Sequence, residues 1–348
     1  MGRIGAFLRL GLTLCALVLI ATPAPAQHGR DVPPSAATGA PSGANPTAQA
    51  VTEEQLFREM RKLEGRVTIP DSKAAILQQP QGRDYRAFHE GVLPWIGGIV
   101  VLGMLVALIA FYLYRGRITL EGVEETGVKI TRFNAFERFT HWMTAVSFIV
   151  LALTGLNYVF GKRLLFPLLG PDAFASWSQW AKYAHNAFAW PFMIGLALMI
   201  VMWIKDNLPQ RGDGTWLRQF GGFMSGRHPP AGRFNAGQKL IFWAVALGGL
   251  ALAASGLVML FPFTTFDING MQIAQYVHGI AGMLLTAVII AHIYIGTLGM
   301  EGAYNAMGTG EVDLGWAKTH HSLWVSSQQR RAERGTTLGR RAGAQMGR

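Results

Sequence analysis

The sequence predicts an all-α integral membrane protein, built as a four-helix transmembrane bundle with one extra N-terminal transmembrane helix. Three observations support this fold class. Half of the 348 residues are hydrophobic and 15% are charged, a composition typical of membrane proteins. Five apolar segments each approach the roughly 20 residues that a helix needs to cross a bilayer. The connections between these segments alternate between strongly and weakly basic ones.

Residues 1–26 have the parts of a secretory signal peptide. Arg3 and Arg9 give a positive start, an apolar run of about a dozen residues follows, and Ala24-Pro25-Ala26 is a small-residue cleavage site. This run is shorter than the roughly 20 residues of a membrane span, which favours cleavage over the alternative of a permanent signal anchor. We therefore expect residues 27–91, which begin with a stretch rich in Pro, Gly, Ala and Ser, to be a largely disordered periplasmic segment.

The five apolar segments define the expected domain organisation. We expect residues 92–114 to form the extra transmembrane helix, residues 115–138 a cytoplasmic connection, residues 139–300 the four-helix bundle, and residues 301–348 a cytoplasmic tail. A buried helix of a soluble protein is the alternative for any one segment, but five in succession favour a membrane protein. The segments are Val92–Tyr114, His141–Phe160, His185–Ile204, Leu240–Phe261 and Val277–Leu298.

The lysine and arginine content of the connections predicts the orientation of the helices. The connection after the first segment holds five such residues, the one after the third holds six, and the stretch after the fifth holds seven, whereas the other two connections hold three and none. The positive-inside rule places the basic stretches in the cytoplasm and the mature N-terminus in the periplasm of a bacterial inner membrane. The net charge of +11 is therefore a membrane-orientation signal, and we expect lipid rather than nucleic acid as a partner.

Four of the nine histidines lie inside the apolar segments or at their ends, and two of them share one helix. His278 and His292 are 14 residues apart, which is close to four helical turns, so both side chains project from the same face. Along the helix axis they are separated by about 21 Å. This spacing suits two haem groups stacked across the bilayer, each taking one ligand from this helix.

The other two ligands follow from depth in the membrane. His185 begins the third segment on the periplasmic side, and His141 begins the second segment on the cytoplasmic side. Matching depths pairs His185 with His278 and His141 with His292. Two imidazoles fill both axial positions of an iron, which favours electron transfer over oxygen chemistry. The alternative for any one of these histidines is a satisfied core residue or a member of a proton path.

Gly155 lies 14 residues after His141 and therefore faces the same way at the depth of the periplasmic haem. The missing side chain permits close approach of a porphyrin, and plain helix packing is the alternative. We expect the other five histidines, which lie in predicted loops and tails, to be solvated. They are His28, His89, His228, His320 and His321.

The only cysteine, Cys15, lies inside the expected signal peptide. A mature chain without cysteine has no disulfide, no ligand for an iron–sulfur cluster and no thioether attachment of haem. Any haem is therefore expected to be bound non-covalently, as haem b.

Several stretches of the chain carry a resemblance to a known family. They are RFNAFERFTHWMTAVSFIVLALTGL, RFNAGQKLIFW, YVHGIAGMLL, VIIAHIYIGTLGMEGAYNAMGTGEV and WAKTHHSLW. Between about Thr131 and Trp324 the chain resembles the cytochrome b (gamma) subunit of respiratory formate dehydrogenases, a dihaem membrane cytochrome. The N-A-G-Q-K element with its following tryptophan, and the W-A-K-x-H-H-x-x-W element, distinguish this family from related hydrogenase and thiosulfate reductase cytochromes.

This resemblance implies cofactors and partners. In the family two haems b are bound by the four helix histidines in the pairing given above. A molybdenum or tungsten catalytic (alpha) subunit oxidises formate, and an iron–sulfur (beta) subunit passes electrons to the periplasmic haem. Menaquinone or ubiquinone is reduced beside the cytoplasmic haem, near residues that match Asn235, Gly237 and Gln238 here. Helix capping is the alternative role for these three residues.

The resemblance therefore implies a membrane-anchoring, electron-transferring and quinone-reducing subunit, with formate oxidation on another subunit. The first 120 residues lie outside the resemblance. Two other classes remain open. One is the cytochrome b subunit of a nickel–iron hydrogenase or another periplasmic oxidoreductase. The other is a structural anchor or a transporter whose histidines relay protons.

Overall fold

The structure is a computed structural model that describes residues 80–119, 126–222 and 228–346, with side chains described between residues 82 and 334 of these ranges. The expected signal peptide and most of the expected periplasmic segment lie outside the described residues. Within the described ranges, five helices are long and apolar enough to cross a membrane, which confirms the predicted all-α membrane fold. They are α4 (Leu93–Arg115), α5 (Ala135–Leu164), α6 (Phe166–Trp203), α8 (Ala236–Leu260) and α9 (Ile268–Tyr294).

Shorter elements join and flank these helices. A short helix and a π-helical turn directly precede α4, so residues 80–91 are helical where a largely disordered segment was expected. The shorter elements are α3 (Pro80–Ala87), η1 (Phe88–Val92), β1 (Lys129–Thr131), η2 (Lys205–Asn207), α7 (Asp213–Arg218), η3 (Phe220–Gly222), η4 (Ile295–Gly299), α10 (Ala303–Gly308), β2 (Glu311–Asp313), α11 (Leu314–His320) and α12 (Ser322–Met346).

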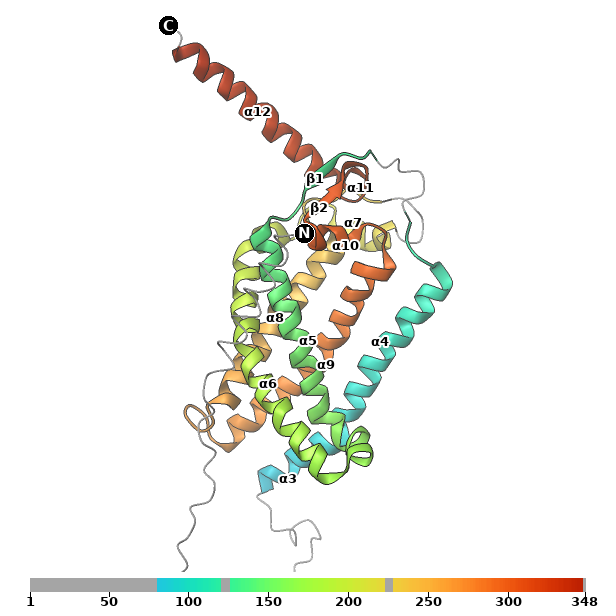
Figure 1. Cartoon of the computed structure of the whole chain (residues 1–348), viewed down its shortest axis with the longest axis vertical. Coiled ribbons are helices and arrows are strands. Elements are labelled where there is room, and N and C mark those ends of the chain that lie inside the picture. Colours follow the sequence, from blue (N-terminus) through green and yellow to red (C-terminus); the bar gives the residue numbers. More distant parts are fainter. Residues whose placement is uncertain (1–79, 120–125, 223–227, 347–348) are drawn as a thin grey trace, which may run out of the picture. The chain divides into compact units, whose positions relative to one another are not determined.

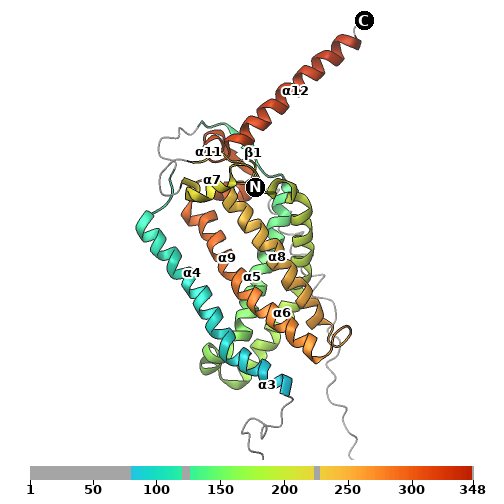
Figure 2. The same cartoon turned by 180° about the vertical axis from the view of Figure 1, so that it is seen from behind.

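The four helices α5, α6, α8 and α9 form a bundle, and α4 lies outside it along α9 (Figures 1 and 2). The helices approach closely at glycines. A Cβ atom added at Gly249 of α8 would lie 2.9 Å from the Leu196 side chain of α6, and one added at Gly97 of α4 would lie 2.8 Å from Met283 Sδ of α9. Small residues allow such close packing between membrane helices.

The third membrane helix begins earlier than its apolar segment. We expected this segment to start at His185, but α6 extends from Phe166 and is interrupted only at Gly170, whose φ is +75°. The backbone resumes its helical path at Pro171, and proline is well tolerated in the first turn of a helix. His185 therefore lies well inside a helix.

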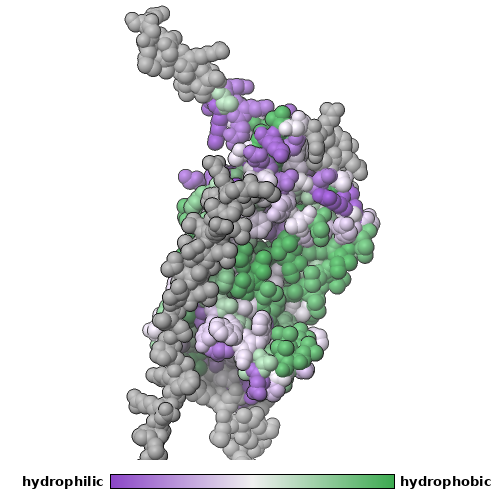
Figure 3. Space-filling model, in the orientation of Figure 1, coloured by the Kyte–Doolittle hydropathy of each residue, from purple (hydrophilic) through white to green (hydrophobic). Residues whose placement is uncertain are grey.

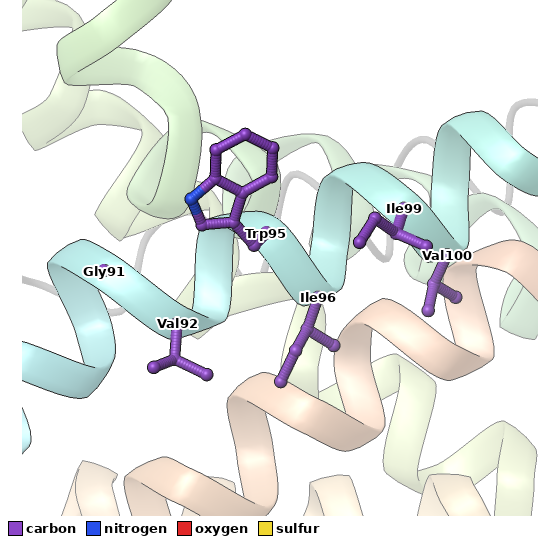
Figure 4. Close-up of a pocket in the computed structure, with 6 residues that line it drawn as sticks. All are labelled: Gly91, Val92, Trp95, Ile96, Ile99 and Val100. Atoms are coloured by element: carbon purple, nitrogen blue, oxygen red, sulfur yellow. The ribbon is translucent and has the colours of Figure 1, made fainter.

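The outer face of α4 is apolar and exposed. Trp95 and Leu113 keep 74% and 79% of their surface accessible, and Figure 3 shows apolar surface gathered along this side and polar surface over the end that carries β1 and β2. An open recess of about 600 Å³ follows residues 91–100 and is lined by one stretch of chain (Figure 4). It lies on the face expected to meet lipid, away from the four predicted ligands.

A folded cap covers the end of the bundle where α5 and α8 begin. In it, β1 pairs with β2 in antiparallel register, with Ile130 opposite Val312, and α10, α11 and the start of α12 pack around this pair. Its core includes Trp316 and Trp324, which are 4% and 6% exposed. The expectation that residues 301–348 form a tail is therefore wrong for their first part, which packs against the bundle up to Val325.

Candidate functional site

The structure brings the four predicted histidines together as two pairs, each facing across the bundle. The ring centroids of His185 on α6 and His278 on α9 are 6.1 Å apart. Those of His141 on α5 and His292 on α9 are also 6.1 Å apart. We call the second pair the capped-end pair, because it lies toward the cap, and the first pair the far-end pair. These are the partners that matching depths predicted from the sequence.

The spacing within each pair fits two ligands of one metal ion. A ligating imidazole nitrogen lies about 2.0 Å from its metal, so two imidazoles on opposite sides of one ion hold their ring centres about 6 Å apart. In the described part of the chain, no group of three or more His, Cys, Asp or Glu side chains is placed to hold a metal ion. Two histidines suffice for an iron whose other four ligands come from a porphyrin, so the residues present fit haem b.

Hydrogen bonds define which nitrogen of the far-end pair is available for a metal. Thr154 Oγ1 donates to the carbonyl oxygen of Val150 at 2.7 Å, as serine and threonine often do within helices. With its one proton engaged there, its oxygen is free to accept Nδ1–H of His185, 2.7 Å away. The Leu151 backbone makes a further hydrogen bond with this ring. Ser255 Oγ does the same, donating to the Ala251 carbonyl at 2.6 Å and accepting from His278 Nδ1–H at 3.0 Å. Both rings then carry the Nε2 lone pair that a metal requires.

Two glycines lie beside the far-end pair. A Cβ atom at Gly155 would lie 3.7 Å from His185 Cε1, so this glycine, which is predicted to leave room for a porphyrin, lies beside His185. Sequence reasoning missed Gly256 on α8, where a Cβ atom would lie 3.3 Å from His278 Cε1. A signal was present, because Thr154-Gly155-Leu156 and Ser255-Gly256-Leu257 are similar tripeptides in two apolar segments.

Asn235, Gly237 and Gln238 lie at the start of α8, at the capped end. Asn235 and Gln238 form a reciprocal capping box: the backbone N–H of Gln238 donates to Asn235 Oδ1 at 2.9 Å, and that of Asn235 donates to Gln238 Oε1 at 3.0 Å. A Cβ atom at Gly237 would lie 2.8 Å from the Trp216 ring. The capping alternative is therefore realised in the structure. It uses the two side-chain oxygens, and the amide nitrogens take no part in it.

A buried charged group joins the starts of α5 and α8. Glu137 Oε1 accepts from Arg233 Nη2 at 2.6 Å and from Trp203 Nε1 at 2.9 Å, and Arg233 Nη1 donates to Asp206 at 3.0 Å. Arg132 is 3% exposed and donates to the Arg233 carbonyl oxygen at 2.7 Å. Burial, and to a lesser degree the charge of Arg233, lowers the pKa of Arg132 to about 9. This group anchors the capped end of the bundle.

The expectation of solvated histidines is wrong for His320 and His321, which are 7% and 1% exposed. His321 Nδ1 lies 2.8 Å from the Gly232 carbonyl oxygen, and the His320 ring is 4.4 Å from that of His228. Burial and the nearby His228 lower the pKa of His320 to about 3, and burial holds the pKa of His321 well below its usual range. Both are uncharged parts of the cap. His89 is partly buried, 4.9 Å from the Tyr158 ring, and His28 lies outside the described residues.

The chain is similar to known cytochromes over the bundle and part of the cap. Residues 132–310 match the family described as prokaryotic cytochrome b561. The cytochrome b556(fdo) subunit of formate dehydrogenase from Escherichia coli K12 is 30% identical over 209 residues, which cover 59% of this chain and 96% of the relative. The nitrate-inducible cytochrome b556(Fdn) subunit of that strain is 29% identical over 202 residues, covering 56% and 89%. A formate dehydrogenase cytochrome b556 subunit of Haemophilus influenzae is 26% identical over 206 residues, covering 58% and 84%.

Proposed function

Because the chain belongs to the prokaryotic cytochrome b561 family, we propose that it is the dihaem, membrane-anchoring cytochrome b subunit of a formate dehydrogenase that reduces quinone. One observation carries this proposal. Inside a bundle of membrane helices, two pairs of histidines face each other, and the ring centroids within each pair are 6.1 Å apart. Relatives named as formate dehydrogenase cytochrome b556 subunits support the identity of the complex.

In this proposal His185 and His278 hold one haem b, and His141 and His292 hold the other. Each haem supplies a one-electron ferric–ferrous couple when bound. The helices α5, α6, α8 and α9 keep both pairs out of water, and α9 orients one ligand of each pair about 21 Å apart along its axis. Gly155 leaves space beside the far-end ligand.

The far-end pair is proposed to face the periplasm, where an iron–sulfur subunit would deliver electrons from a molybdenum or tungsten subunit that oxidises formate. The capped end would then face the cytoplasm of a bacterial inner membrane. The basic connections, which join the membrane helices at the capped end, support this orientation. Electrons would cross the bilayer from the far-end to the capped-end pair.

Quinone, either menaquinone or ubiquinone, is proposed to bind at the start of α8 beside the capped-end pair. Quinone carbonyl groups accept hydrogen bonds, and the amide nitrogens of Asn235 and Gln238 are donors that the capping box does not use. Gly237 keeps the Trp216 ring close to this helix start. The helix N-terminus thus has a structural role and retains donors for a ligand.

Replacing each amide by the matching acid tests the function and this quinone site together. Asn235→Asp and Gln238→Glu keep a capping oxygen but lose the amide donor, and α5 already uses an Asn134–Glu137 box of this kind. In membranes with the partner subunits, we expect formate to reduce both haems normally and quinone reduction to slow by about three- to tenfold, the loss of one hydrogen bond. Stopped-flow absorption of the b-type α band follows both steps.

The control is Asn134→Asp, which makes the same change at the start of α5 and should leave quinone reduction unchanged. Normal quinone turnover in both α8 variants would move the quinone site elsewhere. Haems reduced by hydrogen but not by formate would instead assign the chain to a hydrogenase.

The orientation is tested by fusing alkaline phosphatase, which is active only in the periplasm. We expect activity for a fusion after Arg83 and none for fusions after Lys129 or Glu311, because the basic connections retain those positions in the cytoplasm. Equal expression of the three fusions, checked by immunoblot, is the control. The reverse pattern of activity would overturn the proposed direction of electron flow.

A further inference from the structure

An internal repeat relates α5 and α8. Arg-Phe-Asn-Ala occurs at residues 132–135 and again at residues 233–236, where it caps each helix. The two copies pack against each other reciprocally: Arg132 Nη2 donates to the Arg233 carbonyl oxygen, and Arg233 Nη2 donates to the Arg132 carbonyl oxygen, at 2.7 and 3.3 Å. The two helices therefore start from one kind of local structure.

The repeat extends through both helices to the far-end pair. In each copy, a hydroxyl residue followed by Gly-Leu lies 22 positions after the arginine, as Thr154 in α5 and Ser255 in α8. Each hydroxyl donates to a carbonyl of its own helix and accepts Nδ1–H from one histidine of the far-end pair. One repeated element therefore contacts both ligands from the side opposite the proposed iron.

The capped-end pair lacks this arrangement at His141. In the described part of the chain, Nδ1 of His141 is buried and has no hydrogen-bond partner. In the repeat, His141 itself occupies the position nine residues after the arginine, and the second copy has Phe242 there. The two pairs therefore have the same ring spacing, but His141 lacks the hydrogen bond that both rings of the far-end pair make.

We propose that Thr154 and Ser255 are positioning residues that hold the far-end ligands in one tautomer and lower the reduction potential of the far-end haem below that of the capped-end haem. This inference rests on the proposed function, since it concerns the haem that His185 and His278 would hold. An acceptor on Nδ1–H makes an imidazole a stronger electron donor. A stronger donor stabilises the more positively charged ferric state over the ferrous state, which lowers the potential.

The consequence is directional. Both ligands of the far-end haem have such an acceptor, whereas His141 of the other pair has none. The far-end haem then has the lower potential, so electron transfer from the far end to the capped end releases free energy. The hydroxyl groups thus bias the same transfer that the proposed quinone site requires, without contacting quinone or the partner subunits.

Spectroelectrochemical titration of the purified holoprotein tests this inference. We expect Thr154→Val, which keeps the shape of the side chain, and Ser255→Ala each to raise the potential of one haem only. A tenfold change in the equilibrium constant between ferric and ferrous haem corresponds to about 59 mV in the potential of a one-electron couple. We expect each variant to raise the haem potential by about this amount. Thr154→Ser and Ser255→Thr restore the hydroxyl and should restore the potential.

The matched control is Thr286→Val on α9, because Thr286 Oγ1 makes the same kind of bond to the carbonyl oxygen of Gly282. It should shift neither potential. Two bound haems with unchanged potentials in Thr154→Val and Ser255→Ala would overturn the inference and leave the proposed function intact. A wild-type chain purified with no haem would overturn the proposed function itself. If one of these two variants loses haem, the other supplies the decisive potential, because both hydroxyl groups contact ligands of the same haem.

Discussion

Replacing His278 with alanine should remove one haem per chain and leave the other bound. The reason is that α9 supplies one imidazole to each pair, and the two imidazoles are about 21 Å apart along the helix axis, so the loss of one does not disturb its counterpart. His292→Ala should remove the other haem, and the double variant should bind none. Pyridine haemochrome analysis against protein concentration measures this directly, with two haems expected for the wild type.

The partner ligands make the same experiment sharper. His185→Ala should reproduce the spectrum of His278→Ala, and His141→Ala that of His292→Ala, because the two histidines of each pair would hold the same haem. His89→Ala is the matched control: it removes a histidine that belongs to neither pair and should keep both haems. Unchanged haem content in any of the four ligand variants would contradict the assignment of that residue.

Replacing Glu137 with alanine should lower the free energy of unfolding by about 3 kcal/mol. Removing one partner of a buried ion pair costs about 3–5 kcal/mol, and the lower end applies because Asp206 still contacts Arg233. The Glu137 side chain is 9% exposed and accepts hydrogen bonds from Arg233, Trp203 and the Asn134 backbone, so all three donors lose an acceptor. The temperature at which the detergent-solubilised protein loses its haem spectrum reports the change.

Glu137→Gln separates charge from hydrogen bonding at this position. Glutamine keeps an acceptor for the capping box, as Gln238 does in α8, but removes the negative charge opposite Arg233. We expect a loss of stability between those of the wild type and Glu137→Ala. If both variants were as stable as the wild type, the charged group would not anchor the capped end.

Much of the membrane architecture was predictable because it depends on local properties of the chain. Hydropathy along the sequence located the five membrane helices that the described residues form, and the 14-residue spacing on α9 predicted that His278 and His292 share a face. The expected depths of the four histidines in the membrane predicted the two pairs whose ring centroids lie 6.1 Å apart in the structure. The orientation and the haem ligation remain predictions that the experiments above test.

The cap and the hydrogen bonds around the ligands were not predictable in this way. His320 and His321 belong to a polar stretch, and only its packing against distant residues makes them buried; His321 meets the carbonyl oxygen of Gly232, 89 positions earlier. The contact between Thr154 and His185 spans 31 positions and depends on the crossing of α5 and α6.

The sequence by itself therefore determined the approximate positions of the membrane helices, the helical phase of the histidines and which histidines face each other. It could do so because each apolar segment must cross the bilayer, which fixes the depth of every residue along it. Tertiary structure decided which polar groups are buried and which atom each one meets. Burial and hydrogen bonding depend on contacts between segments far apart in the chain, so the residue pattern of one segment cannot predict them.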